Sequence, residues 1–129
     1  NEKMALEQNI PVKIVKLDYS LIARAIAKRK TQGFFKIIVT DDDEMKILGM
    51  RAIGAHASSA IQGVALLMQM NESITQLAEL VHPHPSIIEG IQECVRMLLN
   101  KSVFKSAVFQ DGLKCYRLCD GEKIPLQRL

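Results

Sequence analysis

The sequence predicts an α+β fold, in which helices pack on one face of an antiparallel β-sheet. Two segments rich in β-branched and aromatic residues precede residue 55, with a run of acidic residues between them. Segments with apolar residues at helical spacing follow from residue 57 to residue 99. Because the strands come first and the helices later, the pattern favours segregated layers over alternating α/β units.

The first 54 residues predict a short helix and three strands. Residues 2–8 have a helical pattern, and residues 11–17 alternate in the manner of a strand with one mixed face. Residues 33–40 and 46–54 form the next two predicted strands. The acidic residues 41–44 between them are short and polar enough to close an antiparallel hairpin.

Three helices are predicted after this hairpin. Residues 57–70 are apolar around most of the circumference, so we expect this helix to be buried on more than one side. Ser73 and Gln76 have the spacing of a capping box that begins a short helix through Leu80. The last clear helix covers about residues 87–99. Its predicted apolar face consists of Ile87, Ile88, Ile91, Cys94, Val95 and Leu98, and its polar face of Gln92, Glu93, Arg96 and Asn100.

The chain divides into a main domain, residues 1–100, and a C-terminal extension, residues 101–129. The extension is compatible with a β-hairpin, because a strand over residues 113–118 could turn at Asp120-Gly121 into residues 123–126.

Composition limits the class of protein. The 129 residues suit one compact domain, with 48% hydrophobic and 24% charged residues. The net charge of +3 is too small to indicate nucleic acid, and no apolar run is long enough for a membrane span. Three widely spaced cysteines and no visible signal peptide predict a cytoplasmic protein. The charged start at Asn1, without methionine, suggests a fragment or processed product.

The segment from Val81 to Glu89 carries the most chemistry. His84 is a side chain suited to proton transfer near neutral pH, and Glu89, five residues later, could fix its tautomer. A structural interpretation competes with this one. Ser86 and Glu89 match a capping box, in which the glutamate only reaches back to the helix start and His84 is a loop residue.

Other polar groups predict less. His82 and His84 form H-x-H, but no nearby cysteine or acid completes a zinc site, so we predict no metal. Cys115 and Cys119 could be small apolar residues or a redox pair, while Cys94 is expected in the core.

Two charged runs are expected on the surface. The acidic run 41–44 lacks the spacing of a calcium loop. The basic cluster in residues 24–30, whose local structure the pattern does not define, lacks interleaved aromatic residues for stacking on bases. The chain also lacks a Gly-rich dinucleotide loop and a nucleophile elbow.

The motif His82-Pro83-His84-Pro85-Ser86-Ile87-Ile88-Glu89 resembles the H-x-H-P-[ST]-x-x-E signature of dihydrolipoyl dehydrogenases, a family of flavin-dependent pyridine nucleotide–disulfide oxidoreductases. The order of the preceding segments agrees with that family. They are Arg24-Ala25, Gly33-Phe34-Phe35-Lys36, Ile47-Leu48-Gly49 with Gly54, the helix from Ile61 to Met68 and the helix from Ile74 to Leu80. The resemblance covers about residues 1–100.

This resemblance implies a C-terminal dimerisation domain of a homodimer, with FAD and NAD(P) domains upstream and no cofactor held by this fragment itself. His84 would be the acid–base catalyst for a dithiol or disulfide in the partner subunit's site, and Glu89 would hold it. The resemblance also implies a cis His84–Pro85 bond, with both residues close to the partner's flavin. The fragment alone would be inactive.

Two departures from the family pattern stand out. Gly54-Ala55-His56-Ala57 lacks the family's proline and acid before the long helix, and the residues after Lys101 are extra. Related mercury-reducing enzymes carry tyrosine in the position of His84 and a C-terminal cysteine pair, which Cys115 and Cys119 resemble only faintly.

The alternative hypothesis is a free-standing dimerisation module that uses the His-rich turn to bind a metal or ligand.

Overall fold

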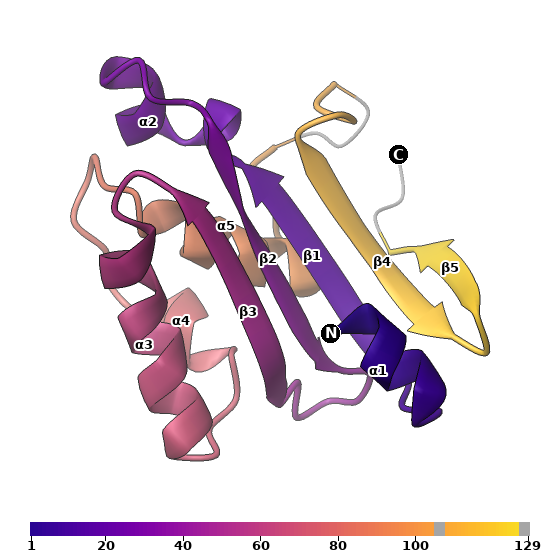
Figure 1. Cartoon of the computed structure of the whole chain (residues 1–129). Coiled ribbons are helices and arrows are strands. Elements are labelled where there is room, and N and C mark those ends of the chain that lie inside the picture. Colours follow the sequence, from indigo (N-terminus) through magenta and orange to yellow (C-terminus); the bar gives the residue numbers. More distant parts are fainter. Residues whose placement is uncertain (105–107, 127–129) are drawn as a thin grey trace.

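Five strands form one antiparallel sheet in the computed structural model, which describes residues 1–104 and 108–126 (Figure 1). The order across the sheet is β3-β2-β1-β4-β5. The strands are β1 (Val12–Asp18), β2 (Gly33–Thr40), β3 (Ile47–Gly54), β4 (Leu113–Cys119) and β5 (Glu122–Pro125). The predicted hairpin is therefore confirmed as β2 and β3, which pair in antiparallel register from Gly33–Gly54 to Val39–Ile47.

Helices lie on both faces of this sheet, but unequally. They are α1 (Glu2–Glu7), the short 3₁₀ turn η1 (Tyr19–Leu21), α2 (Ala23–Ala27), α3 (Ala57–Gln69), α4 (Gln76–Glu79) and α5 (Glu89–Leu98). The helices α3, α4 and α5 share the main core with one face, while α1 covers a smaller cluster on the opposite face (Figure 1). The predicted α+β class is confirmed, and α1 packs on the second face.

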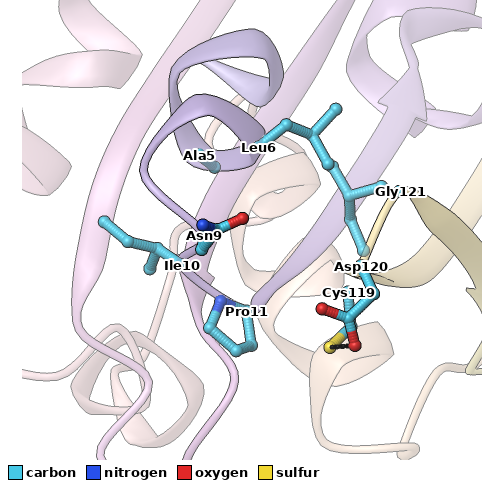
Figure 2. Close-up of a pocket in the computed structure, with 9 residues that line it drawn as sticks. Ala5, Leu6, Asn9, Ile10, Pro11, Cys119, Asp120 and Gly121 are labelled. Carbon is cyan, nitrogen blue, oxygen red and sulfur yellow. Dashed lines mark hydrogen bonds between the residues drawn. The ribbon is translucent and has the colours of Figure 1, made fainter.

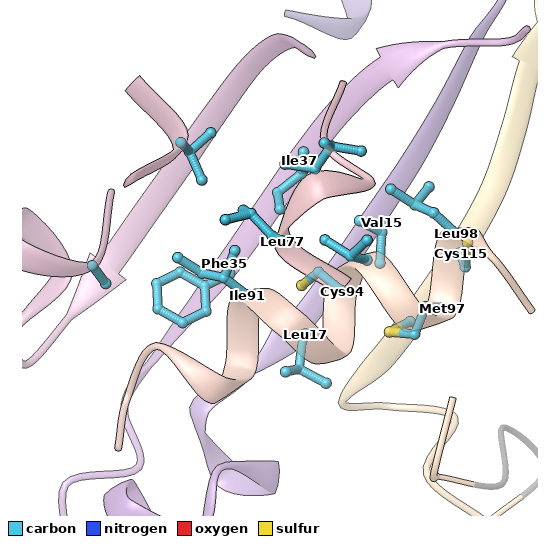
Figure 3. Close-up of a cluster of buried hydrophobic side chains, with 14 of the residues drawn as sticks. Val15, Leu17, Phe35, Ile37, Leu77, Ile91, Cys94, Met97, Leu98 and Cys115 are labelled. Atoms are coloured by element: carbon cyan, nitrogen blue, oxygen red, sulfur yellow. The ribbon is translucent and has the colours of Figure 1, made fainter. Parts of the chain in front are cut away.

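The main core joins α5 to the strands β1 and β2 (Figure 3). Phe35 and Ile37 of β2 are fully buried with Ile91 and Cys94 of α5, and each such side chain contributes about 1.5–3 kcal/mol of hydrophobic stabilisation. Gly90 allows the helix to approach closely, since a Cβ there would lie 2.5 Å from Ile22 Cδ1. This packing fixes the N-terminal end of α5, where His84 and Glu89 lie.

The predicted C-terminal hairpin forms as β4 and β5. β4 pairs with β1 from Val12–Leu118 to Leu17–Leu113, so the extension widens the same sheet. Leu113 and Cys115 are buried in the main core. The division at residue 100 stays a prediction, and residues 105–107 and 127–129 of the extension lie outside the described part of the chain.

The predicted burial of α3 on more than one side is not reached within this single chain. Only Ala60 and Val64 of α3 are buried, and Leu66 and Met70 are more than half exposed, because one face of the helix packs on the sheet. The predicted capping box of the next helix was wrong. Ser73 does not cap the next helix through the amide of Gln76. Its hydroxyl accepts from the Thr75 amide instead, and α4 begins only at Gln76 without a side-chain cap.

Candidate functional site

The loop between α4 and α5 brings His84 and Glu89 together. His84 Nδ1 donates a hydrogen bond of 2.8 Å to Glu89 Oε1. The His84–Pro85 peptide bond is cis, as the sequence resemblance implied. The imidazole is 71% exposed and the Glu89 side chain 27% exposed, so the pair lies at the surface with its carboxylate partly shielded.

Glu89 performs the two tasks that the sequence left as alternatives. Its Oε2 accepts from the Ser86 amide at 2.6 Å, while its Oε1 accepts from His84. This is one half of a capping box. The other half is absent, because the buried Ser86 hydroxyl has no hydrogen-bond partner among the described residues. The second carboxylate oxygen is thus left for the imidazole.

The electrostatics of the pair favour a charged carboxylate. Partial burial acts to raise the pKa of Glu89, but the Ser86 amide and the bond to His84 outweigh it, and the pKa is lowered. A carboxylate at the first turn of a helix is also stabilised by the helix dipole. Since an ionised carboxylate only accepts, Nδ1 of the neutral imidazole carries the proton and Nε2 has a free lone pair. Nε2 can therefore take up a proton and return it.

Neighbouring residues hold the loop. The His82 ring donates through Nε2 to the Leu77 carbonyl at 3.2 Å, which ties it to α4 rather than to His84. Gln92 Nε2 donates to the Leu80 carbonyl at 3.1 Å and so attaches the loop to α5. No three metal-ligating side chains lie together anywhere in residues 1–104 and 108–126.

The cysteines are separated along β4. Residues four apart in a strand are about 13 Å apart, too far for a disulfide between Cys115 and Cys119. Burial raises the pKa of Cys115 to about 12, and burial also raises that of Cys94 well above its usual value. Cys119 donates to Asp120 in a hollow beside α1 (Figure 2), and that bond raises its pKa. All three therefore favour the unreactive thiol.

The acidic run closes the β2–β3 hairpin as a surface turn, with one exception. Asp42 accepts from the Thr40 hydroxyl and the Met45 amide, which shapes the turn. Asp41 instead has a buried side chain that pairs with Lys13 and with Arg117 of β4. In the basic cluster of residues 24–30, α2 ends at Ala27. The three basic side chains that follow it are exposed, namely Lys28, Arg29 and Lys30.

The sequence did not predict the burial of Glu93. It was assigned to the polar face of α5, but it is only 4% exposed. Its Oε1 accepts from the Ser102 hydroxyl and from the Val103 amide at 3.1 Å, and Arg96 lies 3.7 Å from its Oε2. Helical spacing could not reveal this burial, because the covering segment comes from beyond the helix.

A family model supports the resemblance. The model for the pyridine nucleotide-disulphide oxidoreductase dimerisation domain matches residues 1–95. The chain belongs to this family. The predicted family membership is therefore confirmed.

No helix within residues 1–104 and 108–126 has the length and apolar character needed to cross a membrane.

Similar proteins agree with this assignment. The chain is 35% identical over 85 residues to dihydrolipoyl dehydrogenase from Chlamydia muridarum, which covers 66% of the chain and 18% of that protein. It is 32% identical over 92 residues to the Bacillus subtilis protein of the same name, which covers 71% and 19%. The chain thus spans about a fifth of the length of the curated relatives it matches.

Solved structures share the fold. LpdA from Mycobacterium tuberculosis has a TM-score of 0.68 with 23% identity, over 75% of this chain and 21% of that one. The HOCl-induced flavoprotein disulfide reductase from Escherichia coli has a TM-score of 0.70 with 24% identity, over 75% and 22%.

Proposed function

We propose that this dimerisation domain supplies His84 as the acid–base group to the dithiol or disulfide site of a partner subunit, in an FAD- and NAD(P)-dependent oxidoreductase similar to dihydrolipoyl dehydrogenase. The observation that carries the proposal is the 2.8 Å bond between His84 Nδ1 and Glu89, which leaves Nε2 available on a largely exposed ring. The 71% exposure of this ring leaves it accessible to a group from a partner subunit.

The proposed role of the chain is proton transfer. His84 Nε2 takes the proton from a substrate thiol, and Glu89 stabilises the imidazolium that results. The thiolate attacks one sulfur of an upstream disulfide, forms a mixed disulfide and releases the other sulfur as thiolate. In the reverse direction the imidazolium returns its proton. Flavin and nicotinamide, held by domains upstream, would supply the electron transfer when bound, and His84 and Pro85 would be the residues of this chain next to the partner's flavin.

A homodimer suits the exposed apolar surface. Leu66 and Met70 of α3 are 57% and 59% exposed, and Val81, just before the His-rich turn, is 96% exposed. Exposed apolar surface of this kind marks protein interfaces.

The buried free thiols of Cys94 and Cys115 are in keeping with a cytoplasmic location, which is part of the proposal.

Turnover of dihydrolipoamide with NAD by the complete protein tests the proposal. We expect His84→Gln to lower kcat/KM by about 10²- to 10⁴-fold, the range for a lost general acid–base group. His82→Gln is the matched control, because it alters the other imidazole of the same turn and should retain most activity. Near-normal turnover by His84→Gln would remove this residue from the mechanism.

Subunit exchange tests the shared site. Dimers of His84→Gln protein and dimers lacking the upstream redox cysteines should each be inactive. If each active site uses the histidine of the other subunit, mixed dimers should recover up to one working site. Absence of any recovery in verified mixed dimers would contradict a histidine supplied across the interface.

A further inference from the structure

The segment after α5 folds back along this helix toward His84. The helix ends at Leu98, and Asn100 adopts a left-handed conformation with φ 57°. The chain then reverses, so that Ser102 and Val103 reach Glu93, more than one turn back along α5. These residues lie beyond the part of the chain that the family model matches.

Glu93 holds this fold-back segment. A buried carboxylate is unfavourable unless hydrogen bonds and a countercharge compensate it. Here the Ser102 hydroxyl and the Val103 amide donate to Oε1, while Oε2 has no hydrogen-bond partner among the described residues and faces the Arg96 guanidinium at 3.7 Å. The Phe104 amide in turn donates to the Ser102 hydroxyl oxygen, which fixes the next residue.

The fold-back segment forms one wall of a cavity beside His84. The cavity has a volume of about 220 Å³. Its polar lining consists of His84, Glu89, Glu93 and Arg96, and its apolar lining includes Leu21, Ile22, Val103 and Phe104. The Phe104 ring is held edge-on by Phe109 at a centroid distance of 5.4 Å. Such a cavity is small compared with sites for drug-sized ligands, so it suits a slender group rather than a wide one.

We propose that Phe104 is a specificity-determining residue for the thiol or disulfide substrate that meets His84, and that Glu93 positions it. This inference rests on the proposed function and deepens it. The aromatic wall restricts the width of a substrate beside the imidazole, so slender aliphatic disulfides such as lipoamide are accepted and wide ones are rejected. Because the wall comes from residues outside the matched family segment, it would set this protein's preference apart within the family.

Steady-state reduction of two disulfides by the complete protein with NADH tests the proposal. The probes are lipoamide, which is slender, and glutathione disulfide, which is wide. Phe104→Ala should raise kcat/KM for glutathione disulfide relative to lipoamide by about 10-fold, the lower end of the range for a changed pocket contact. Phe104→Leu should give a smaller change in the same direction, and it serves as the readout if the alanine variant does not fold.

Variants of Glu93 separate positioning from general stability. Glu93→Leu removes the acceptor and should shift the specificity ratio as Phe104→Ala does. Glu93→Gln keeps an acceptor oxygen and should retain the wild-type ratio. Phe34→Ala is the matched control, since Phe34 is a partly exposed phenylalanine of β2 that does not line this cavity. A ratio within twofold of wild type in both Phe104→Ala and Glu93→Leu would overturn the proposal.

Failure of the proposed function itself gives a different result. In that case the wild-type protein would reduce neither disulfide, and the role of Phe104 would be tested by the binding of lipoamide. Fluorine NMR of fluorophenylalanine-labelled protein, with the Phe104 signal assigned from Phe104→Leu, should show a shift of that signal on addition of lipoamide. An unchanged Phe104 signal at saturating lipoamide would overturn the inference independently of activity.

Discussion

Glu89 and Glu93 lie one turn apart on α5, yet each holds a different loop by a different physical means. Glu89 begins the helix, where free backbone amides and the helix dipole favour a carboxylate, and it binds Ser86 and His84 from the preceding turn. Glu93 is in the middle of the helix and depends on a segment that returns from the C-terminal side. The comparison shows that a carboxylate at a helix start is organised locally, whereas one inside a helix is organised by tertiary packing.

The largest expected effect is the loss of Glu93. Glu93→Ala leaves the Val103 amide and the Ser102 hydroxyl unpaired and removes the countercharge of Arg96. We expect the free energy of unfolding to fall by about 2–4 kcal/mol, measured by urea denaturation. Glu79→Ala, an exposed glutamate of α4, should change it by less than about 0.5 kcal/mol. Equal effects of the two substitutions would contradict a structural role for the buried carboxylate.

The next effect separates catalysis from stability. Glu89→Gln keeps an acceptor oxygen but removes the charge that stabilises the imidazolium. We expect kcat/KM of the complete protein for dihydrolipoamide to fall about tenfold, which corresponds to about 1.4 kcal/mol. Glu93→Gln should leave this parameter within about threefold of wild type. If Glu93→Gln reduced the rate as much as Glu89→Gln, the assigned division between the two carboxylates would be wrong.

A smaller effect should appear in the dependence of stability on pH. The pKa of Glu89 is lowered in the folded chain from its usual 4.5, although partial burial opposes this. The unfolded chain therefore binds more protons near that pH, and the contribution of Glu89 to stability, present above pH 4.5, is lost as the pH falls. Urea denaturation from pH 7 to pH 3 should show that Glu89→Gln loses less of its free energy of unfolding than wild type. Parallel curves for the two proteins would contradict the lowered pKa.

The smallest effect is the coupling between the two carboxylates. Like charges at positions i and i+4 of a helix repel by about 0.2–0.5 kcal/mol. A double-mutant cycle of Glu89→Gln and Glu93→Gln, read from urea denaturation at low and high salt, should show this repulsion and its screening. A coupling above about 1 kcal/mol would mean that the two loops form one cooperative unit rather than two independent attachments.

Much of the fold was predictable because the signals are local. The β2–β3 hairpin, α5 and the β4–β5 hairpin were all visible in hydrophobic spacing and turn residues. The pairing of β4 with β1 was not predictable, because the register between distant strands depends on which faces become buried together. The burial of α3 was overestimated, since a helix apolar on all sides does not reveal whether its own chain or a partner covers it.

The candidate site shows the same division. The sequence by itself determined the residues and spacing of His84 and Glu89, because a five-residue interval across a turn into a helix start is set by short-range geometry. Only the tertiary structure decided that Glu93 is buried, with Ser102 and Val103 bound to its carboxylate. The physical reason is that hydrogen bonds within a turn depend on neighbouring backbone angles, while burial depends on segments that meet only after the chain has folded back.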